Sequence, residues 1–355
     1  MTQEAYHGGA FFDAIGMDLL HLERAAGIIS ADVLDAWFDP SPRVLRLLSE
    51  HLSFLLRTSP PNHAEGLVAE IALRRGVPEA CLLPGSGSSS LLFGCLPRML
   101  PERPRVLTLA PMYTEYGHIA GDLMGGSVHH LELLPANGFA IDGEALLSEA
   151  IRLRPHAVLL VNPNNPTGRL WPRAGVLQFL DRAPQGTLVV VDETYIDYAG
   201  VEQSLEREVA NRPDLVVVKS MSKVYALSGA RVAYMAAHPG RAAALRPWLP
   251  PWPVGLLAQA AAMEALRDPA YYQARYAETH GLRTQLRAAL RHLQPYPSEA
   301  NFFLIEPPEP EGTAARLRER GIFLREFPDG PLAGRYLRVT VKDGAQNERI
   351  VEALA

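Results

Sequence analysis

The chain has 355 residues, 48% of them hydrophobic, and can therefore bury a large core shared by two closely packed domains. Its formal net charge of -5, without a basic stripe, argues against nucleic acid as a partner. No apolar run reaches about 18 residues and the N-terminus lacks a basic segment followed by an apolar one, so we expect neither membrane spanning nor secretion. Cys81 and Cys95 lie in apolar stretches without metal-ligand spacing, which indicates reduced thiols of a cytoplasmic protein and no metal site.

Residues 1–42 are predicted to form an N-terminal arm, because Pro40 and Pro42 impose an extended crossing at its end. From Arg43 to Leu56 apolar residues recur at helical spacing, and a proline break precedes a second helix around Ala64 to Arg75. A glycine- and serine-rich segment then leads into a helix that we expect to start near Leu91.

Short β-branched runs alternate with helical segments in the middle of the chain. The runs are Val106 to Ala110, Ala157 to Val161, Leu188 to Val191 and Leu215 to Val218. This alternation predicts an α/β fold with a mostly parallel sheet flanked by helices, and we expect this large domain to span residues 43–245. The proline-rich segment 247–253 marks a boundary. Beyond it we expect a smaller α/β domain over residues 246–355, with strands at 301–305 and 336–341 and a helix near 313–320.

Each β-branched run is followed by polar residues, which should meet in one crevice because ligands bind at the carboxyl ends of strands in such sheets. Asp192 ends an apolar run, where a carboxylate is costly unless it is paired. A protonated ring nitrogen would be a suitable partner, with Tyr195 reaching the oxygen of the same ring; a helix N-cap is the alternative. Asn165 could donate to that oxygen or stabilise a turn. Tyr113 could lie flat on the ring or be an ordinary core or surface tyrosine.

Two segments are suited to a phosphorylated aldehyde. Lys223 lies between Ser220 and Arg231, so one amine is flanked by two anion-binding groups; the alternative is a surface lysine in a serine-rich turn. Residues 85–90, Gly-Ser-Gly-Ser-Ser-Ser, offer backbone N–H groups at a helix start, which suit a phosphate or form a capped turn.

Arginines near the C-terminus are candidates for anionic parts of a substrate. Arg338 lies in a strand that should otherwise be core, which indicates either a buried ion pair or a site for a carboxylate. Arg325 and His7 are candidates for a second anionic group, with an ordinary surface position as the alternative for each.

The segments SMSKVYALSGAR (220–231), NPNNPTG (162–168), DETY (192–195) and LRVTV (337–341), in this order and spacing, resemble the pyridoxal-phosphate (PLP) enzymes of fold type I, the class I/II aminotransferase group. The branch that contains histidinol-phosphate aminotransferase and threonine-phosphate decarboxylase is the most similar. The similarity to the decarboxylase extends to YTEYG (113–117), PWPV (251–254) and GIFLRE (321–326), and it covers essentially the whole chain.

The resemblance implies a role for each candidate residue. Lys223 would carry the cofactor as an imine, Asp192 would pair with the pyridine nitrogen, Asn165 and Tyr195 would bond the ring oxygen, and Tyr113 would stack on the ring. The phosphate would be held by Ser88, Ser89, Ser220, Ser222 and Arg231. Arg338 would bind the α-carboxylate, and His7 and Arg325 a substrate phosphate. The resemblance also implies a homodimer.

Three segments depart from the pattern of this branch. The arm has Asp35-Ala-Trp-Phe-Asp-Pro40 where an Asn-x-Asn-Pro-Leu-Gly segment usually touches substrate. Arg57-Thr-Ser-Pro60 replaces a segment whose tyrosine reaches the neighbouring subunit's cofactor, and Thr58 and His63 are candidates to replace that tyrosine. Ser88-Ser-Ser90 stands where the phosphate loop usually has an acidic residue or a Thr-Glu pair.

The resemblance therefore implies an enzyme that forms an external aldimine with an α-amino acid, and we expect an aminotransferase, with Lys223 as general base for the Cα–H bond. A decarboxylase of a phosphorylated amino acid is the main alternative. A specialised PLP lyase or bond-forming enzyme and a PLP-binding regulatory protein are the others. The amino acid, the acceptor and the pathway stay open.

Overall fold

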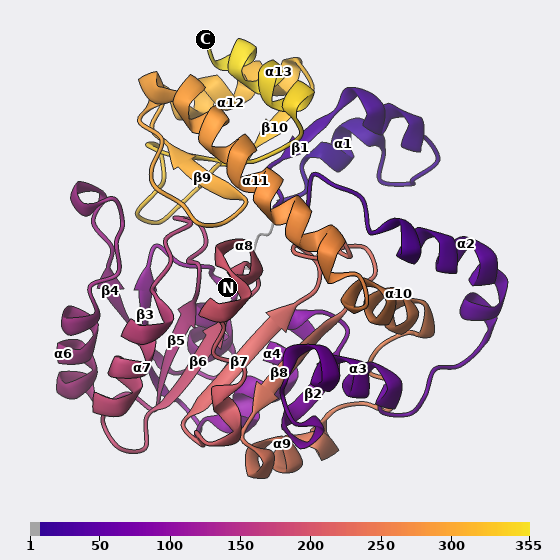
Figure 1. Ribbon diagram of the computed structural model, residues 1–355. Coiled ribbons are helices and arrows are strands. Elements are labelled where there is room, and N and C mark those ends of the chain that lie inside the picture. Colours follow the sequence, from indigo (N-terminus) through magenta and orange to yellow (C-terminus); the bar gives the residue numbers. More distant parts are fainter. Residues whose placement is uncertain (1–7) are drawn as a thin grey trace.

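A seven-stranded sheet forms the centre of the larger part of the protein (Figure 1). The structure is a computed structural model that describes residues 8–355, so His7 lies outside the described residues. The strand order is β2-β8-β7-β6-β5-β3-β4, and β8 runs antiparallel to both of its neighbours while the other pairs are parallel. These strands are β2 (Leu82–Gly85), β3 (Arg105–Ala110), β4 (Ser127–Glu132), β5 (Ala157–Val161), β6 (Leu188–Asp192), β7 (Leu215–Ser220) and β8 (Ala233–Ala237).

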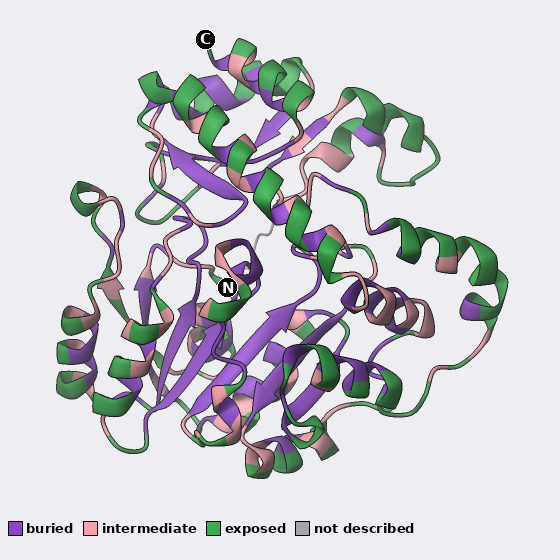
Figure 2. Cartoon of the chain, in the orientation of Figure 1, coloured by how far each residue is buried: buried purple, intermediate pink, exposed green. Residues whose placement is uncertain are grey.

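Helices flank this sheet and shield its apolar strands from water. Every residue of β5, β6, β7 and β8 is buried, as Figure 2 shows, which explains why these strands are rich in valine, leucine and alanine. The α-helices are α1 (Phe11–Ile15), α2 (Pro42–Arg57), α3 (Glu65–Arg75), α4 (Ser88–Met99), α5 (Glu115–Gly117), α6 (Gly143–Leu153), α7 (Arg173–Arg182), α8 (Ile196–Ala199), α9 (Pro239–Leu245), α10 (Leu256–Leu266), α11 (Pro269–Ala289), α12 (Pro310–Glu319) and α13 (Gly344–Leu354). None of the helices in residues 8–355 has the length and apolar character needed to cross a bilayer.

A second hydrophobic core lies in the upper part of Figure 1. There β9 (Phe302–Ile305) pairs antiparallel with β11 (Leu337–Thr340), and β1 (Ile29–Ala31) pairs parallel with β10 (Ile322–Leu324). The β1–β10 pairing joins segments that are almost 300 residues apart, since Ile29 lies opposite Ile322. This pairing brings the residues that follow β1 close to the residues that flank β11.

The predicted elements differ from the structure at a few places. The helix expected near Leu91 begins at Ser88, because the serines themselves form its first turn. Strands β1, β2, β4, β8 and β10 were not predicted. Strand β4 is an edge strand with the polar sequence SVHHLE, and β8 is the alanine-rich AYMAA, so neither has the β-branched composition that marks the other runs.

A buried ionic cluster fixes the segments around the end of β6. Arg75 of α3 donates to Asp197 at 3.0 Å and to Glu206 at 2.7 Å. The ammonium of Lys219, in β7, lies 3.1 Å from Asp197 and 3.5 Å from Glu193. Burial alone would raise the pKa of Asp197, but the charges of Arg75 and Lys219 lower it to about 2. Two of the most buried cations in the chain are therefore neutralised by local carboxylates.

Candidate active site

The carboxyl ends of β2, β3, β5, β6 and β7 lie along the same edge of the sheet, because these strands run in the same direction. Ser88, Tyr113, Asn165, Asp192 and Lys223 each end or follow one of these strands. The topology thus brings together the polar clusters that the sequence placed at strand ends, as expected for a ligand site in an open α/β sheet.

Lys223 lies three residues beyond the end of β7, and its side chain contacts a carboxylate from the arm. Its Nζ lies 2.7 Å from Asp35 Oδ1 and 3.5 Å from Ser228 Oγ. The hydroxyl of Tyr198 donates to the carbonyl oxygen of Lys223 at 2.9 Å, which fixes the backbone from the side of α8. The Lys223 side chain keeps 21% of its surface exposed, so the amine remains accessible.

The chain contains three lysines, and their surroundings differ. Lys219 is buried in the ionic cluster, and its side chain lies on the opposite face of the sheet from that of its neighbour in β7, Ser220. Lys342 follows β11 and is buried, and this burial lowers the pKa of its amine. Of the three, Lys223 combines an accessible amine with a position among the strand-end clusters.

Asp192 is a buried carboxylate at the end of β6. Its Oδ1 accepts from the backbone N–H of Thr194 at 2.9 Å and from the Thr194 hydroxyl at 2.6 Å, while Oδ2 accepts from Tyr116 at 3.0 Å. Burial raises the pKa of this carboxyl above its ordinary value, although the three hydrogen bonds favour the charged form. The alternative of a helix N-cap does not apply, because α8 begins at Ile196 with Tyr195 at its N-cap. A ligand with a cationic N–H group would neutralise the charge of this carboxylate.

Asn165, Tyr195 and Arg338 form a connected group. The Asn165 amide donates to the Tyr195 hydroxyl at 3.4 Å, and the amide oxygen accepts from Arg338 at 2.7 Å. Arg338 also donates to the carbonyl oxygen of Asp32 at 2.7 Å. Within residues 8–355 it makes no ion pair with a carboxylate, and its Nε has no hydrogen-bond partner. Burial lowers the pKa of Arg338 to about 10. The alternative of a buried ion pair is therefore not what the structure shows, and a buried cation without an anion suits a carboxylate ligand.

Tyr113 is held at its hydroxyl by a neighbouring carboxylate. The hydroxyl donates to Glu115 Oε2 at 2.6 Å, and Ser89 donates to the same oxygen at 3.0 Å. Burial, followed by the charge of Glu115, raises the pKa of Tyr113, so its hydroxyl stays protonated at neutral pH. Its partly exposed ring is thereby fixed between α4 and the end of β3, where it can cover a flat ligand.

The remaining predicted residues gather at the start of α4. Ser88 is the first residue of this helix, where backbone N–H groups are free to bind an anion. The preceding Gly87 has a φ of +88°, and a Cβ at this position would lie 2.4 Å from the guanidinium of Arg231. Arg231 lies 3.5 Å from the Ser222 hydroxyl, and the buried Ser220 hydroxyl accepts from the N–H of Ser222 at 3.3 Å. Hydroxyls, backbone donors and an arginine therefore surround a cradle that only glycine leaves open.

We expect Gly87→Ala to weaken binding of pyridoxal phosphate at least about 10-fold, which corresponds to about 1.4 kcal/mol. The added methyl group would push Arg231 out of the cradle. Gly186→Ala is the matched control, because Gly186 has nearly the same φ, +87°, and no heavy atom near its Cβ position. Titration of the cofactor-free variants by absorbance measures the affinity. Equal losses in both variants would assign the effect to backbone strain and contradict the cradle.

The arm and the C-terminal strands enclose a second part of the site. Arg325 pairs with Arg338 through backbone hydrogen bonds of 3.1 and 3.0 Å. Asp32 follows β1 and accepts from the backbone N–H of Gly9 at 2.8 Å. Asp32 and Arg325 also border a cavity of about 550 Å³ that Phe327 and other residues of the C-terminal part line. Leu337, the neighbour of Arg338 in β11, also lines this cavity.

Sequence reasoning missed several residues of this site. Asp35 was noted as part of an unusual segment, but its contact with Lys223 spans 188 positions and no local pattern reports it. Glu115 and Tyr116, which hold Tyr113 and Asp192, lie in the YTEYG segment, whose spacing after β3 was the available signal. Lys342 had none.

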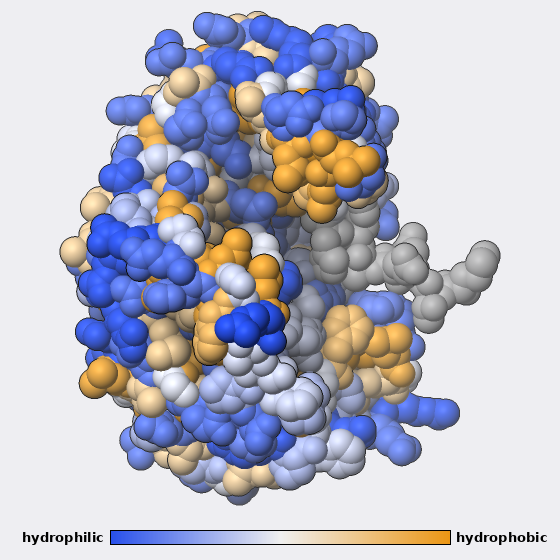
Figure 3. Space-filling view, turned by 90° about the vertical axis from the view of Figure 1, so that its right-hand side faces the viewer, coloured by the Kyte–Doolittle hydropathy of each residue, from blue (hydrophilic) through white to orange (hydrophobic). Residues whose placement is uncertain are grey.

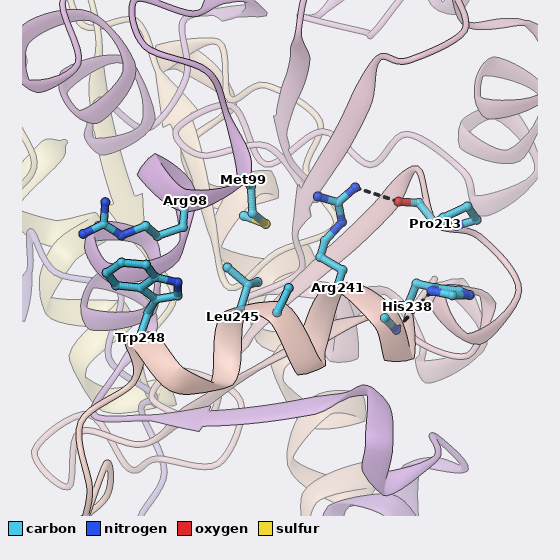
Figure 4. Close-up of a pocket in the computed structure, with 9 residues that line it drawn as sticks. Arg98, Met99, Pro213, His238, Arg241, Leu245 and Trp248 are labelled. Atoms are coloured by element: carbon cyan, nitrogen blue, oxygen red, sulfur yellow. Dashed lines mark hydrogen bonds between the residues drawn. The ribbon is translucent and has the colours of Figure 1, made fainter.

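Another cavity, of about 310 Å³, lies away from this edge of the sheet (Figure 4). Pro213 precedes β7 and His238 follows the antiparallel β8, so both mark the opposite edge, and Arg241 reaches from α9 to the carbonyl oxygen of Pro213. This cavity holds none of the predicted site residues. Among the described residues, no group of three or more His, Cys, Asp or Glu side chains is arranged to hold a metal ion.

Comparisons with known proteins agree with this geometry. Residues 33–354 match the family model for aminotransferase class I and II. Histidinol-phosphate aminotransferase 2 of Thiobacillus denitrificans is 31% identical over 338 residues, which cover 93% of this chain and 92% of that protein. The crystal structure of histidinol-phosphate aminotransferase from Sinorhizobium meliloti in complex with pyridoxal-5′-phosphate has a TM-score of 0.81 and 26% identity, and covers 94% of this chain and 92% of that one. The crystal structure of L-threonine-O-3-phosphate decarboxylase from Porphyromonas gingivalis has a TM-score of 0.81 and 25% identity, and covers 92% of this chain and 98% of that one.

These comparisons confirm the predicted resemblance, the fold type I architecture and the assignment to a PLP-dependent enzyme. The cofactor fits the residues present, since the glycine cradle beside Arg231 suits its phosphate and the buried Asp192 suits its ring nitrogen. The chain belongs to the class I and II aminotransferase family, and its cofactor is pyridoxal 5′-phosphate.

Proposed function

We propose that this enzyme transfers an amino group from an α-amino acid to an oxo acid at the edge of the sheet that carries Lys223. Two features of the site carry the proposal. Lys223 has an accessible amine, and the buried Arg338 has an Nε that lacks a hydrogen-bond partner among the described residues. An amine and a carboxylate site at the same edge of the sheet suit the two groups that every α-amino acid shares.

Bound PLP supplies an electron sink for the bond that breaks at the substrate Cα. We assign the attachment of the cofactor and the movement of the Cα proton to Lys223. Asp192 would hold the N–H of the ring, Asn165 and Tyr195 would donate to its oxygen, and Tyr113 would cover its face. The phosphate would be held by Ser88, Ser89, Ser220, Ser222 and Arg231. Arg338 orients the substrate by its carboxylate through two parallel N–H bonds.

A decarboxylase is the second candidate. The similarity to the threonine-phosphate decarboxylase of P. gingivalis supports it, as does Arg325, which borders the cavity of about 550 Å³. In that reading Arg325 binds a second anionic group of the substrate, and His7, outside the described residues, assists. The two reactions differ in which bond at Cα lies perpendicular to the ring.

We further propose that the protein acts as a homodimer in the cytoplasm. Exposed apolar side chains on α2 support the dimer: Leu52, Phe54 and Leu56 are 46%, 51% and 69% exposed. Figure 3, which views the side of the molecule that carries α2, shows hydrophobic side chains in separate exposed clusters. Thr58, at the end of α2, and the exposed His63 are the residues we assign to the partner's cofactor phosphate.

The proposed location in the cytoplasm is supported by two buried free thiols, Cys81 and Cys95. We also divide the chain into the arm (1–42), the cofactor domain (43–245) and the small domain (246–355).

A spectral screen of amino acids tests the proposed reaction. With a substrate and no acceptor, we expect the visible band of bound PLP to give way to the band of pyridoxamine phosphate, with one oxo acid formed per site. Release of carbon dioxide without that conversion would assign decarboxylation instead. Arg338→Lys should raise KM for every active amino acid, because lysine cannot form the two parallel bonds.

A further inference from the structure

Asp35 is the carboxylate that contacts the reactive amine. It lies between β1 and α2, in the segment that replaces the usual asparagine-containing arm, and its Oδ1 is 2.7 Å from Lys223 Nζ. The other carboxylates near the cofactor site have different partners: Asp192 accepts from Thr194 and Tyr116, and Glu115 from Tyr113 and Ser89. Within residues 8–355, no other carboxylate pairs with Nζ.

The surroundings of Asp35 keep it charged and partly open to solvent. Burial alone would raise the pKa of this carboxyl, but the charge and hydrogen bond of Lys223, with Ser228 and Lys342, bring it below its ordinary value. The charge of Asp35 in turn contributes to raising the pKa of Tyr195 and Tyr198 at α8, and Asp32 of the arm acts with Asp35 on the amine of Lys342. The Asp35 side chain is 42% exposed, so a solute can reach it.

The incoming substrate needs a proton acceptor at this point. An α-amino acid carries an ammonium group at neutral pH, whereas only the free amine can attack a carbon. Its nitrogen must approach the cofactor carbon to which Nζ is joined. Any atom bonded to that carbon lies within a few ångströms of Nζ, and hence of Asp35 Oδ1. When Nζ is joined to the cofactor it is no longer an ammonium, so Asp35 loses its ionic partner as the substrate ammonium arrives.

We propose that Asp35 accepts the proton of the substrate ammonium and returns it to Lys223, a role that rests on the proposed function. One N–H bond of the substrate ammonium breaks and its proton passes to Oδ1. The lone pair left on nitrogen forms the bond to the cofactor carbon, one electron pair of the double bond between that carbon and Nζ moves to Nζ, and Nζ takes a second proton from the substrate nitrogen. The proton on Oδ1 then passes to Nζ, and the remaining bond between Nζ and the carbon breaks with its electrons staying on Nζ while the substrate nitrogen forms the double bond. Lys223 leaves as a neutral amine that can accept the Cα proton, with Asp35 as a carboxylate beside it, the two groups that form the ion pair in the structure.

The loaded enzyme tests the proposal through two amines that differ in charge. In stopped-flow absorbance, Asp35→Asn should slow the exchange of Lys223 for a substrate amino acid at least about 100-fold, the lower range for a general base. Exchange with methoxyamine, which is uncharged at neutral pH, should change less than about threefold in the same variant. Asp35→Glu should restore part of the rate, and Asp39→Asn, an exposed residue of the same arm, should leave both rates unchanged. Equal slowing of both amines, or of neither, would overturn the proposal.

The cofactor-free protein gives a readout that does not depend on PLP chemistry. The ion pair with Asp35 Oδ1, 2.7 Å long, occupies Nζ in the cofactor-free protein, so Asp35→Asn should speed modification of Lys223 by trinitrobenzenesulfonate at neutral pH at least about 10-fold. Mass spectrometry resolves this site easily, because the chain has only two other lysines. Modification at the wild-type rate would contradict the proposal even if exchange were slowed. Should the asparagine variant fail to fold by circular dichroism, Asp35→Ser takes its place. A protein that binds no PLP at all would refute the proposed function, and the modification rate would still decide whether Asp35 occupies the Lys223 amine.

Discussion

Replacing Lys223 by alanine should reduce amino transfer at least about 10⁴-fold, the upper range for loss of a general base. The variant loses both the amine that attaches the cofactor and the group that moves the Cα proton. Because the phosphate cradle and Asp192 remain, we expect the variant to bind PLP and to retain a coloured complex with a substrate amino acid that does not turn over. Steady-state assays and absorbance spectra measure the two effects.

Lys342→Met is the control for this prediction. Lys342 is also a buried lysine near the arm, yet no hydrogen bond joins it to Asp192, Asn165 or Lys223 among the described residues. This variant should keep covalent attachment of PLP even if substrate binding changes. Loss of attachment in Lys342→Met with retention in Lys223→Ala would reverse the assignment.

Asp192→Asn should lower kcat at least about 100-fold, or about 2.7 kcal/mol of transition-state stabilisation. The neutral amide cannot hold a proton on the ring nitrogen, so the cofactor withdraws electrons less strongly. The amide is nearly isosteric with the carboxylate and keeps an acceptor for Thr194. We therefore expect the loss to appear in kcat more than in PLP affinity, and absorbance titration separates the two.

The stability of the cofactor-free Asp192→Asn variant provides a second test, because this substitution should lower kcat without lowering the free energy of unfolding. Burial raises the pKa of Asp192 in the folded protein, so its contribution to stability is fully present below the unfolded pKa and is lost as pH rises through the folded one. At neutral pH the charged carboxylate is therefore a net cost, and Asp192→Asn should not lower the free energy of unfolding in urea. Asp197→Asn is the matched control, because the pKa of Asp197 is lowered to about 2 and its loss leaves Arg75 and Lys219 underpaired. That control should lose about 3–5 kcal/mol.

The sequence predicted the strands of the site well because they are uniformly buried. Runs such as Ala157–Val161 have no solvent face, so they stand out as continuous apolar segments and the polar residue after each one is conspicuous. Lys223 and Asp192 could be found in this way. Strand β8 could not be predicted in this way, because an alanine-rich segment is equally compatible with a helix. Only its pairing with β2 and β7 shows that it is a strand.

Contacts between distant segments could not be predicted from local patterns. The alternatives for Arg338 were a buried ion pair and a carboxylate site, and they separate only when its neighbours are known to be Asn165 and the carbonyl oxygen of Asp32. The contact of Asp35 with Lys223 depends on the pairing of β1 with β10, which brings the arm back over the sheet. Motif spacing thus predicted the cofactor, and tertiary packing adds the contacts of Asp35 and Arg338, the groups that we propose meet the substrate.

Borohydride reduction of the PLP-loaded enzyme tests most directly the claim that Lys223 carries the cofactor. We expect loss of the visible band and one phosphopyridoxyl group per chain. Proteolytic cleavage after Lys219 separates the two neighbouring lysines, so the label should appear in the peptide that begins at Ser220 and contains Lys223. A label on Lys219 or Lys342, or none at saturating PLP, would contradict the account.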